Sequence, residues 1–150
     1  MAQSLAKVLI HLTFSTKQHR RLIAEDVREE LGAYLVGILR NLDSPALRVN
    51  CVEDHAHILF SLSRNYAIKT IVEEVKKGSS KWIKTKGPRF GRFYWQNGYG
   101  AFSVSPSNVD AVIAYIENQQ EHHRTMTFQE EFRRLLQKHG IEYDERYVWD

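Results

Sequence analysis

The sequence predicts an α+β fold, in which a four-stranded antiparallel sheet carries two helices on one face and further helices follow it. Two observations support this prediction. Four short segments show the alternation or apolar content typical of strands, and four longer segments repeat apolar residues at helical spacing. Along the chain their order is strand, helix, strand, strand, helix, strand, helix, helix.

The first half of the chain supplies a strand, a helix and a hairpin. Apolar residues alternate over 8–14, as in a strand, and recur at helical spacing over 27–42. The segments 47–52 and 56–62 are predicted strands, and the short polar turn Glu53-Asp54 joins them.

The second half supplies a helix, a strand and two helices. Apolar spacing predicts a helix from Ile68 to about Gly87, where Pro88 disfavours helix in the residue before it, and a strand over 99–104 follows. Ser107 is the predicted N-cap of a third helix with the apolar stripe Val109, Val112, Ile113 and Ile116. Thr127 and Glu130 form a capping-box signature that starts a fourth helix.

A βαββαβ order closes as a ferredoxin-like, or RRM-like, sheet. The crossover connections are right-handed, so both helices lie on one face, and the middle strands pair as a hairpin. The chain has 150 residues and shows neither a repeat nor a Pro-, Gly- or Ser-rich linker. Residues 1–150 are therefore predicted to form a single domain.

Composition excludes several classes of protein. With 43% hydrophobic and 26% charged residues, the chain is neither collagen-like nor of low complexity nor wholly disordered. Its single cysteine, Cys51, can form neither an intramolecular disulfide nor a Cys-based zinc site. No stretch approaches the ~18 apolar residues of a membrane span, and the start lacks a signal-peptide layout. We therefore expect a cytoplasmic protein.

The most informative short motif is His55-Ala56-His57. Side chains two apart on a strand share a face, so the two imidazoles project together while Ala56, Ile58 and Phe60 point the other way. Two imidazoles at this spacing can bind one divalent cation. The alternative is that two polar residues of a half-exposed strand fall two apart by chance.

Tyr115 and Gln119 form a second candidate pair. They lie four residues apart on the third predicted helix, on one face and at the flank of its apolar stripe. That position borders both core and solvent, which suits a reactive phenol. The alternative is a rim tyrosine and a solvated glutamine. His122 falls on the same flank and is either a third imidazole or a cation at the helix C-terminus.

Together these motifs resemble those of the single-tyrosine HUH transposases of the IS200-like group, which includes REP-associated tyrosine transposases. The resemblance rests on the segment from His11 to Arg21, on His55-Ala56-His57 as the HUH motif, and on Tyr115 followed by Gln119. It implies that both HUH histidines and Gln119 bind Mg²⁺ or Mn²⁺, and that Tyr115 is the nucleophile. The implied activity nicks and rejoins single-stranded DNA at hairpin-flanked sites through a 5′-phosphotyrosine intermediate.

A local basic stretch fits the DNA substrate that the resemblance implies. The net charge is only +3, but residues 76–92 hold seven basic and no acidic side chains. The predicted phosphate contacts are Lys76, Lys77, Lys81, Lys84, Lys86, Arg89 and Arg92, and the predicted stacking faces are Trp82, Phe90, Phe93, Tyr94 and Trp95. A smaller candidate contact comprises Lys17, Arg20 and Arg21. The alternative is a solvated helix face with the aromatic residues in the core.

Other charged residues are less specific. His11 either lies near the metal on the adjacent strand or is a hydrogen-bonded structural histidine. The adjacent carboxylates Glu29-Glu30, Glu73-Glu74 and Glu130-Glu131 diverge by about 100° on a helix and are expected in solvent.

The resemblance also implies a homodimer, in which the tyrosine helix of one protomer can complete the metal site of the other. Two alternative functions are weighed. One is a catalytically silent, domesticated protein of the same fold that binds single-stranded or hairpin DNA. The other is a metal-dependent hydrolase that uses water, the two HUH histidines and a carboxylate such as Asp54.

Overall fold

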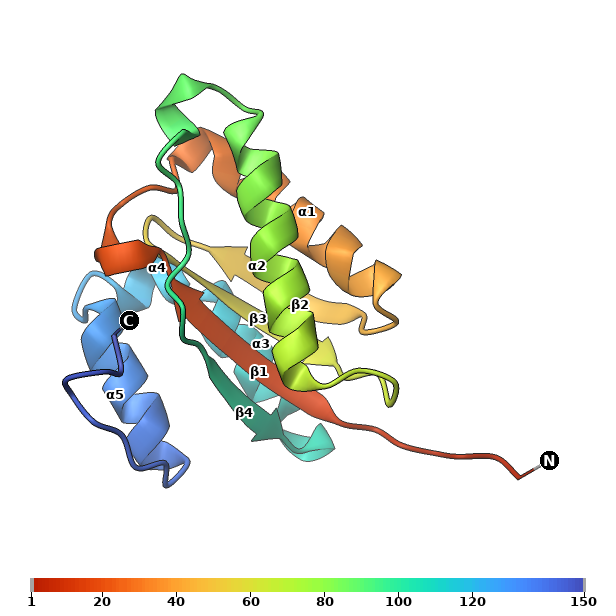
Figure 1. The fold of residues 1–150 in the computed structure, drawn as a ribbon. Helices are drawn as coiled ribbons and strands as arrows, with labels where there is room; N and C mark the ends of the chain where they lie inside the picture. The colour runs from red at the N-terminus through yellow and green to blue at the C-terminus, as the bar shows by residue number, and fades with distance from the viewer. Residues whose placement is uncertain (1, 150) are drawn as a thin grey trace.

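The computed structural model describes residues 2–149 and shows one four-stranded antiparallel sheet covered on both faces (Figure 1). The strands lie in the order β2-β3-β1-β4 and pair antiparallel throughout. Their bounds are β1 Leu9–Ser15, β2 Ala46–Cys51, β3 His55–Ser61 and β4 Gly100–Val104. The predicted βαββαβ order and the β2-β3 hairpin are confirmed.

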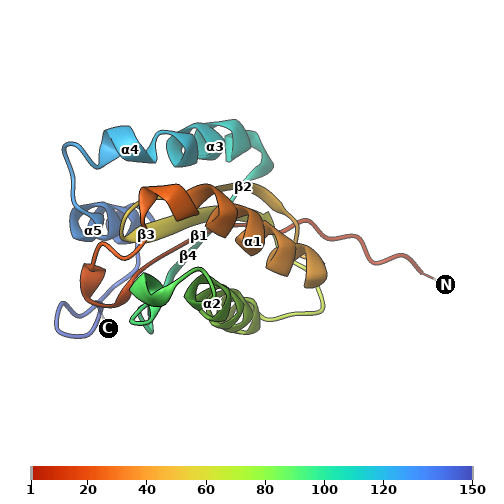
Figure 2. The same ribbon diagram turned by 90° about the horizontal axis from the view of Figure 1, so that it is seen from above.

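The helices are α1 (Arg28–Asn41), α2 (Ile68–Lys84), α3 (Val109–Glu117), α4 (Gln119–His122) and α5 (Phe128–Lys138). Short 3₁₀ turns lie at Lys17–His19, Glu25–Val27, Pro88–Phe90 and Pro106–Asn108. Seen from above, α1 and α2 lie on one side of the sheet, and α3 and α4 lie on the other (Figure 2). Within residues 2–149, no helix has both the length and the apolar content that crossing a membrane demands.

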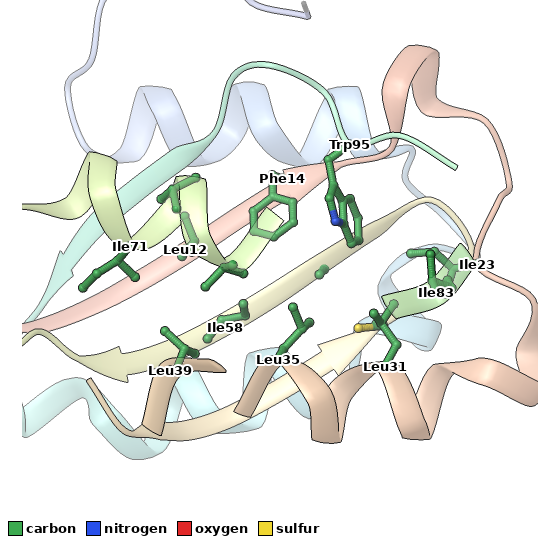
Figure 3. Packing of buried hydrophobic residues seen from close by; sticks show 14 of the residues in the cluster. Leu12, Phe14, Ile23, Leu31, Leu35, Leu39, Ile58, Ile71, Ile83 and Trp95 are labelled. Carbon is green, nitrogen blue, oxygen red and sulfur yellow. The ribbon is translucent and has the colours of Figure 1, made fainter. Parts of the chain in front are cut away.

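The α1 and α2 face of the sheet holds the main core. Leu12 and Phe14 from β1 and Ile58 from β3 pack here against leucines of α1 and isoleucines of α2 (Figure 3). Trp95 closes one end of this core, since its ring meets Phe14 edge-on at 4.7 Å and its indole N–H donates to Ser79 Oγ at 2.9 Å. The fully buried side chains labelled in this view include Leu31, Leu35, Leu39, Ile71 and Ile83.

The other face of the sheet is divided into an apolar half and a polar half. At the apolar end, Leu9 and Leu59 pack against Ile116 of α3. Further along the same strands, His11, His55 and His57 take the equivalent positions on this face and are nearly or fully buried. Because α3, α4 and α5 cover this half, polar side chains are enclosed at one end of the sheet.

Two helix starts differ in how well the sequence predicts them. The Thr127 hydroxyl accepts a hydrogen bond from the Glu130 backbone N–H at 3.2 Å, so the predicted cap of α5 is confirmed. The prediction that Ser107 is the N-cap of the third helix is wrong. A 3₁₀ turn that begins at Pro106 moves the start of α3 to Val109, and the Ser107 hydroxyl lies 3.2 Å from Ser105 Oγ instead.

Gly100 of β4 lies directly against an aromatic ring of α5. A Cβ atom at this position would lie 2.6 Å from Cε1 of Phe132 and 3.0 Å from Cζ of Phe102. Both phenylalanines belong to the buried cluster that seats α5 on the sheet. The absence of a side chain at residue 100 therefore allows α5 to lie as close as it does.

We expect opposite effects from the same substitution at two glycines. Gly100→Ala places a methyl group against a buried ring, and such overpacking costs about 1–3 kcal/mol of unfolding free energy. Gly37→Ala, in α1 with nothing within 4 Å of the new atom, stabilises the protein by about 0.5–1 kcal/mol, because alanine loses less entropy in a helix. Urea unfolding of both variants measures the difference. Equal stability changes would contradict the close approach at Gly100.

Candidate functional site

The candidate site is built around His55 and His57 of β3, both fully buried. Their ring centroids lie 5.2 Å apart. As predicted from the strand period, Ala56, Ile58 and Phe60 point into the main core on the opposite face. That core anchors the strand on one side while it presents two imidazoles on the other.

Two oxygen atoms face the imidazoles from the covering helices. Nε2 of His57 lies 2.9 Å from Oε1 of Glu131, and Nε2 of His55 lies 3.5 Å from the same oxygen. Nε2 of His55 also lies 3.2 Å from Oε1 of Gln119. Ligand atoms of His55, His57 and Glu131 all lie within 4.8 Å of one another, so this cluster is suited to hold a divalent metal.

Each imidazole is oriented by a second hydrogen bond. Nδ1 of His55 lies 2.7 Å from Oδ1 of Asp54, and Nδ1 of His57 lies 2.8 Å from Nε2 of His11. Such bonds turn the other ring nitrogen towards the shared centre, as metal-binding histidines require. Burial, together with the nearby His57, lowers the pKa of His11 to about 3, so this ring stays neutral.

Tyr115 lies beside the cluster in the same chain. Its hydroxyl donates a hydrogen bond to Oε2 of Glu131, and its ring centroid lies 5.7 Å from that of His57. Burial and the negative charge of Glu131 raise the pKa of the Tyr115 hydroxyl above its usual range. In this state the phenol is held as a hydrogen-bond donor.

The prediction that Tyr115 and Gln119 share one helix is wrong in detail. α3 ends at Glu117, and Asn118, with φ −94° and ψ 21°, separates it from α4. The backbone keeps turning through the break, because Asn118 N–H still donates to Ala114 and His122 N–H to Asn118. Gln119 therefore still faces the histidines from one turn beyond Tyr115.

The imidazole that joins the cluster is His123, one residue after the candidate His122. Nε2 of His123 lies 3.1 Å from Oε1 of Gln119 and 3.4 Å from Oε1 of Glu131. Its ring centroid lies 4.3 Å from that of His55. The His122 ring lies against Tyr115 instead, with centroids 4.7 Å apart. His123 lies four residues after Gln119, so the two side chains share one face of this turn.

Glu131 is the main residue that sequence reasoning missed, and its expected place in solvent is wrong. It is 1% exposed, whereas its neighbour Glu130 is exposed. A signal was present, because Glu131 lies three residues after Phe128 and four before Leu135, within the apolar stripe of α5. Burial opposes its ionisation, but the charges and hydrogen bonds of His57 and His123 hold the pKa of this carboxyl well below its usual range.

The basic stretch is divided by the fold. The Lys76 ammonium donates to the carbonyl oxygens of Gln96, Asn97 and Gly98. Lys86 pairs with Glu30 at 2.9 Å and Arg89 with Asp26 at 2.6 Å. Lys77 and Lys81 are exposed on α2, on the sheet face opposite the histidines (Figure 2). The stretch is therefore not one continuous surface.

The predicted stacking role is wrong for three of the five aromatic residues. Phe90, Phe93 and Trp95 are at most 8% exposed and belong to the main core. Trp82 is half-buried and stacks on Tyr34 of α1 with ring centroids 4.9 Å apart. Tyr94, at 55% exposure, is the one whose ring is open to solvent.

A smaller basic hollow forms around Tyr94. A hollow of about 310 Å³ is lined by Lys17, Arg20, Arg92 and Tyr94. The Lys17 backbone N–H donates to the Tyr94 carbonyl at 2.8 Å and so joins the two segments. The Lys84 ammonium lies 4.3 Å from the centroid of the Tyr94 ring. Arg21 points elsewhere, towards Glu53 at 3.9 Å. Residues from two distant basic segments thus meet at one aromatic ring.

Comparison with known proteins agrees with this architecture. A protein of Deinococcus radiodurans R1 described as a candidate transposase superposes with a TM-score of 0.61 at 23% identity, over 79% of this chain and 98% of that chain. A REP-associated tyrosine transposase bound to a REP hairpin superposes with a TM-score of 0.59 at 12% identity, over 82% of this chain and 73% of that chain. No curated protein matches the sequence. The family model for IS200-like transposases matches residues 4–119, and the chain belongs to that family.

Proposed function

We propose that the protein is a DNA transposase that nicks and rejoins single-stranded DNA at hairpin-flanked sites, with Tyr115 as the nucleophile. One observation carries this proposal. The Tyr115 hydroxyl and the imidazole of His57 contact the two oxygens of a single carboxylate, that of Glu131. A phenol, two strand histidines and an amide oxygen therefore meet at one point of a transposase-family fold.

The residues present fit a divalent cation, which we propose to be Mg²⁺ or Mn²⁺. His55 and His57 offer ring nitrogens, and Gln119 and Glu131 offer oxygens, all buried and mutually close. When bound, such a cation supplies positive charge that polarises a phosphodiester towards attack. Asp54 is not placed to serve as a ligand of a hydrolase, because it binds the outer nitrogen of His55.

Tyr115 supplies the new bond. Its oxygen attacks phosphorus, an O–P bond forms, and the bond from phosphorus to the 3′ oxygen breaks, which leaves a 5′-phosphotyrosine and a 3′-hydroxyl. The phenol gives up its proton along its hydrogen bond to Glu131, and the departing 3′ oxygen takes up a proton from water to become the hydroxyl. Because one phosphodiester replaces another, the strand can be rejoined without an energy source.

The basic hollow at Tyr94 is the proposed single-strand contact. Lys17, Arg20 and Arg92 can neutralise phosphates while Tyr94 offers a stacking face. Two of the other predicted contacts, Lys86 and Arg89, are held in ion pairs, and Lys76 is held by backbone carbonyls. A solved relative that binds a REP hairpin supports a hairpin as the natural substrate.

The homodimer stays a prediction. Tyr115 reaches the histidines of its own chain, so the proposed chemistry can be completed within one protomer. Light scattering after size-exclusion chromatography determines the oligomeric state.

We expect Co²⁺ to report on the histidine centre through its visible absorption. His55→Ala and His57→Ala each remove one ring nitrogen and are expected to weaken Co²⁺ binding at least about tenfold. The matched control is His139→Ala. The His139 ring stacks on Phe102 outside the cluster, so this variant is expected to keep the wild-type affinity for Co²⁺. Unchanged Co²⁺ spectra in the first two variants would show that these histidines do not hold the metal.

We expect a covalent adduct between the protein and hairpin DNA in the presence of Mg²⁺ or Mn²⁺. Denaturing electrophoresis detects it on the 5′ end of the cut strand. Tyr115→Phe removes the attacking oxygen and abolishes the adduct, while Tyr147→Phe, at an exposed tyrosine of the tail, leaves it unchanged. Free DNA ends without an adduct would indicate hydrolysis, and binding without cleavage would indicate a silent DNA-binding protein.

We expect the cations around Tyr94 to set the salt dependence of single-strand binding. Each phosphate contact contributes about 0.7 to the slope of log affinity against log salt, so the combined substitution of Lys17, Arg20 and Arg92 by Ala lowers the slope by about 2. The control removes three exposed cations elsewhere, Lys7, Arg64 and Lys69. Fluorescence anisotropy with an oligothymidine measures both. Equal slopes in the two triple variants would place the DNA on another surface.

A further inference from the structure

Two hollows border the histidine cluster, and Tyr115 lines only one of them. The first, of about 590 Å³, is lined by Asp54, His123 and the start of α5. The second, of about 370 Å³, lies between β4, α3 and α5 and is lined by Tyr115, Glu131 and His11. Because His55 and His57 are fully buried, a substrate reaches the phenol through the second hollow.

The walls of this second hollow suit a flat, partly apolar ligand. Phe102 and Val104 of β4, Val112 of α3 and Leu135 of α5 form its apolar lining. Its volume falls within the range of about 300–1,000 Å³ typical of small-molecule sites. A nucleobase turned out of the strand needs this kind of surface, in which apolar and aromatic side chains meet its faces.

His11 brings a ring nitrogen to the hollow. The ring is 4% exposed and lines the cavity, and its Nε2 is occupied by His57. Within residues 2–149 no hydrogen bond to Nδ1 of His11 is found. This nitrogen therefore offers a hydrogen-bonding atom to a ligand in the hollow.

Two cations lie at the mouth of the same hollow. Arg134 and Lys138 of α5 line it and are exposed. Among the described residues, neither forms an ion pair with a carboxylate within 4.0 Å. Free positive charge beside an apolar cavity matches a ligand that combines a base with phosphates.

We infer that this hollow binds the base of the nucleotide next to the phosphate that Tyr115 attacks, with Arg134 and Lys138 on the adjoining phosphates. The inference rests on the proposed function and extends it. His11 would select a base that presents a complementary hydrogen-bonding group to Nδ1, so the chain itself reads one nucleotide at the cleavage site. Sequence preference at that position follows from the cavity.

Covalent capture from a DNA pool tests the inference. Wild-type protein is incubated with Mn²⁺ and hairpin oligonucleotides that carry a randomised single-stranded flank, and the DNA in the adducts is sequenced. Ala111→Trp fills the hollow from an exposed helix position, and Ala114→Trp is the matched control on the same helix outside it. We expect a base preference beside the phosphotyrosine in the wild type and in Ala114→Trp, and its loss in Ala111→Trp.

An abasic nucleotide at the selected position provides the second measurement. It is expected to slow adduct formation about tenfold in the wild type, as the loss of one stacked base does, and to have no further effect in Ala111→Trp. If the tryptophan variant does not fold, Arg134→Ala replaces it and is expected to slow adduct formation about fivefold. The control is Arg64→Ala, at an exposed arginine that does not line the hollow, and it is expected to leave the rate unchanged.

The outcomes separate the two proposals. An identical base preference in the wild type and Ala111→Trp overturns the base-binding hollow and leaves the transposase proposal intact. The absence of any Tyr115 adduct in the wild type overturns the proposed function and this inference with it.

Discussion

The alternation of side chains along β1 and β3 is the constraint on which the rest of the structure depends. A strand sends successive side chains to opposite faces, so the residues that anchor these central strands and the residues that form the site must share them. In β3, Ala56, Ile58 and Phe60 are fully buried in the main core, and the histidines between them are turned to the other face. The core on one face of the sheet therefore fixes the position of the histidines on the other face.

The second constraint is a buried carboxylate. Glu131 is 1% exposed, and an unpaired charge at such depth is costly. Its two oxygens are shared among His57, His123 and the Tyr115 hydroxyl, so β3, α3 and the residue that follows α4 are tied to one side chain of α5.

Much of the fold could be predicted from the sequence because it depends on local periodicity. The strands and helices follow from alternation and helical spacing, the hairpin from the polar turn Glu53-Asp54, and the cap at Thr127 from the capping-box signature with Glu130. The predictions that failed have two kinds of cause. A local 3₁₀ turn at Pro106 moved the start of α3 and Asn118 ended α3 before Gln119, whereas tertiary packing buried Glu131.

The candidate site was predictable to a similar extent. His55, His57, Gln119 and Tyr115 do meet, and their chemical roles stay predictions. The basic stretch shows the limit of composition as evidence, since the charge of residues 76–92 is local in sequence but is divided by the fold. Where Lys76, Lys86 and Arg89 point depends on carbonyls and carboxylates that lie far away in the chain.

The lack of a side chain at Gly100 also bears on the candidate site. Every residue of the sequence motifs lies at or before Gln119, where the family match also ends, whereas Glu131 belongs to α5. A Cβ atom at residue 100 would meet the ring of Phe132, the neighbour of Glu131 in α5. The place of the carboxylate between the histidines and the phenol therefore depends on the smallest residue of β4.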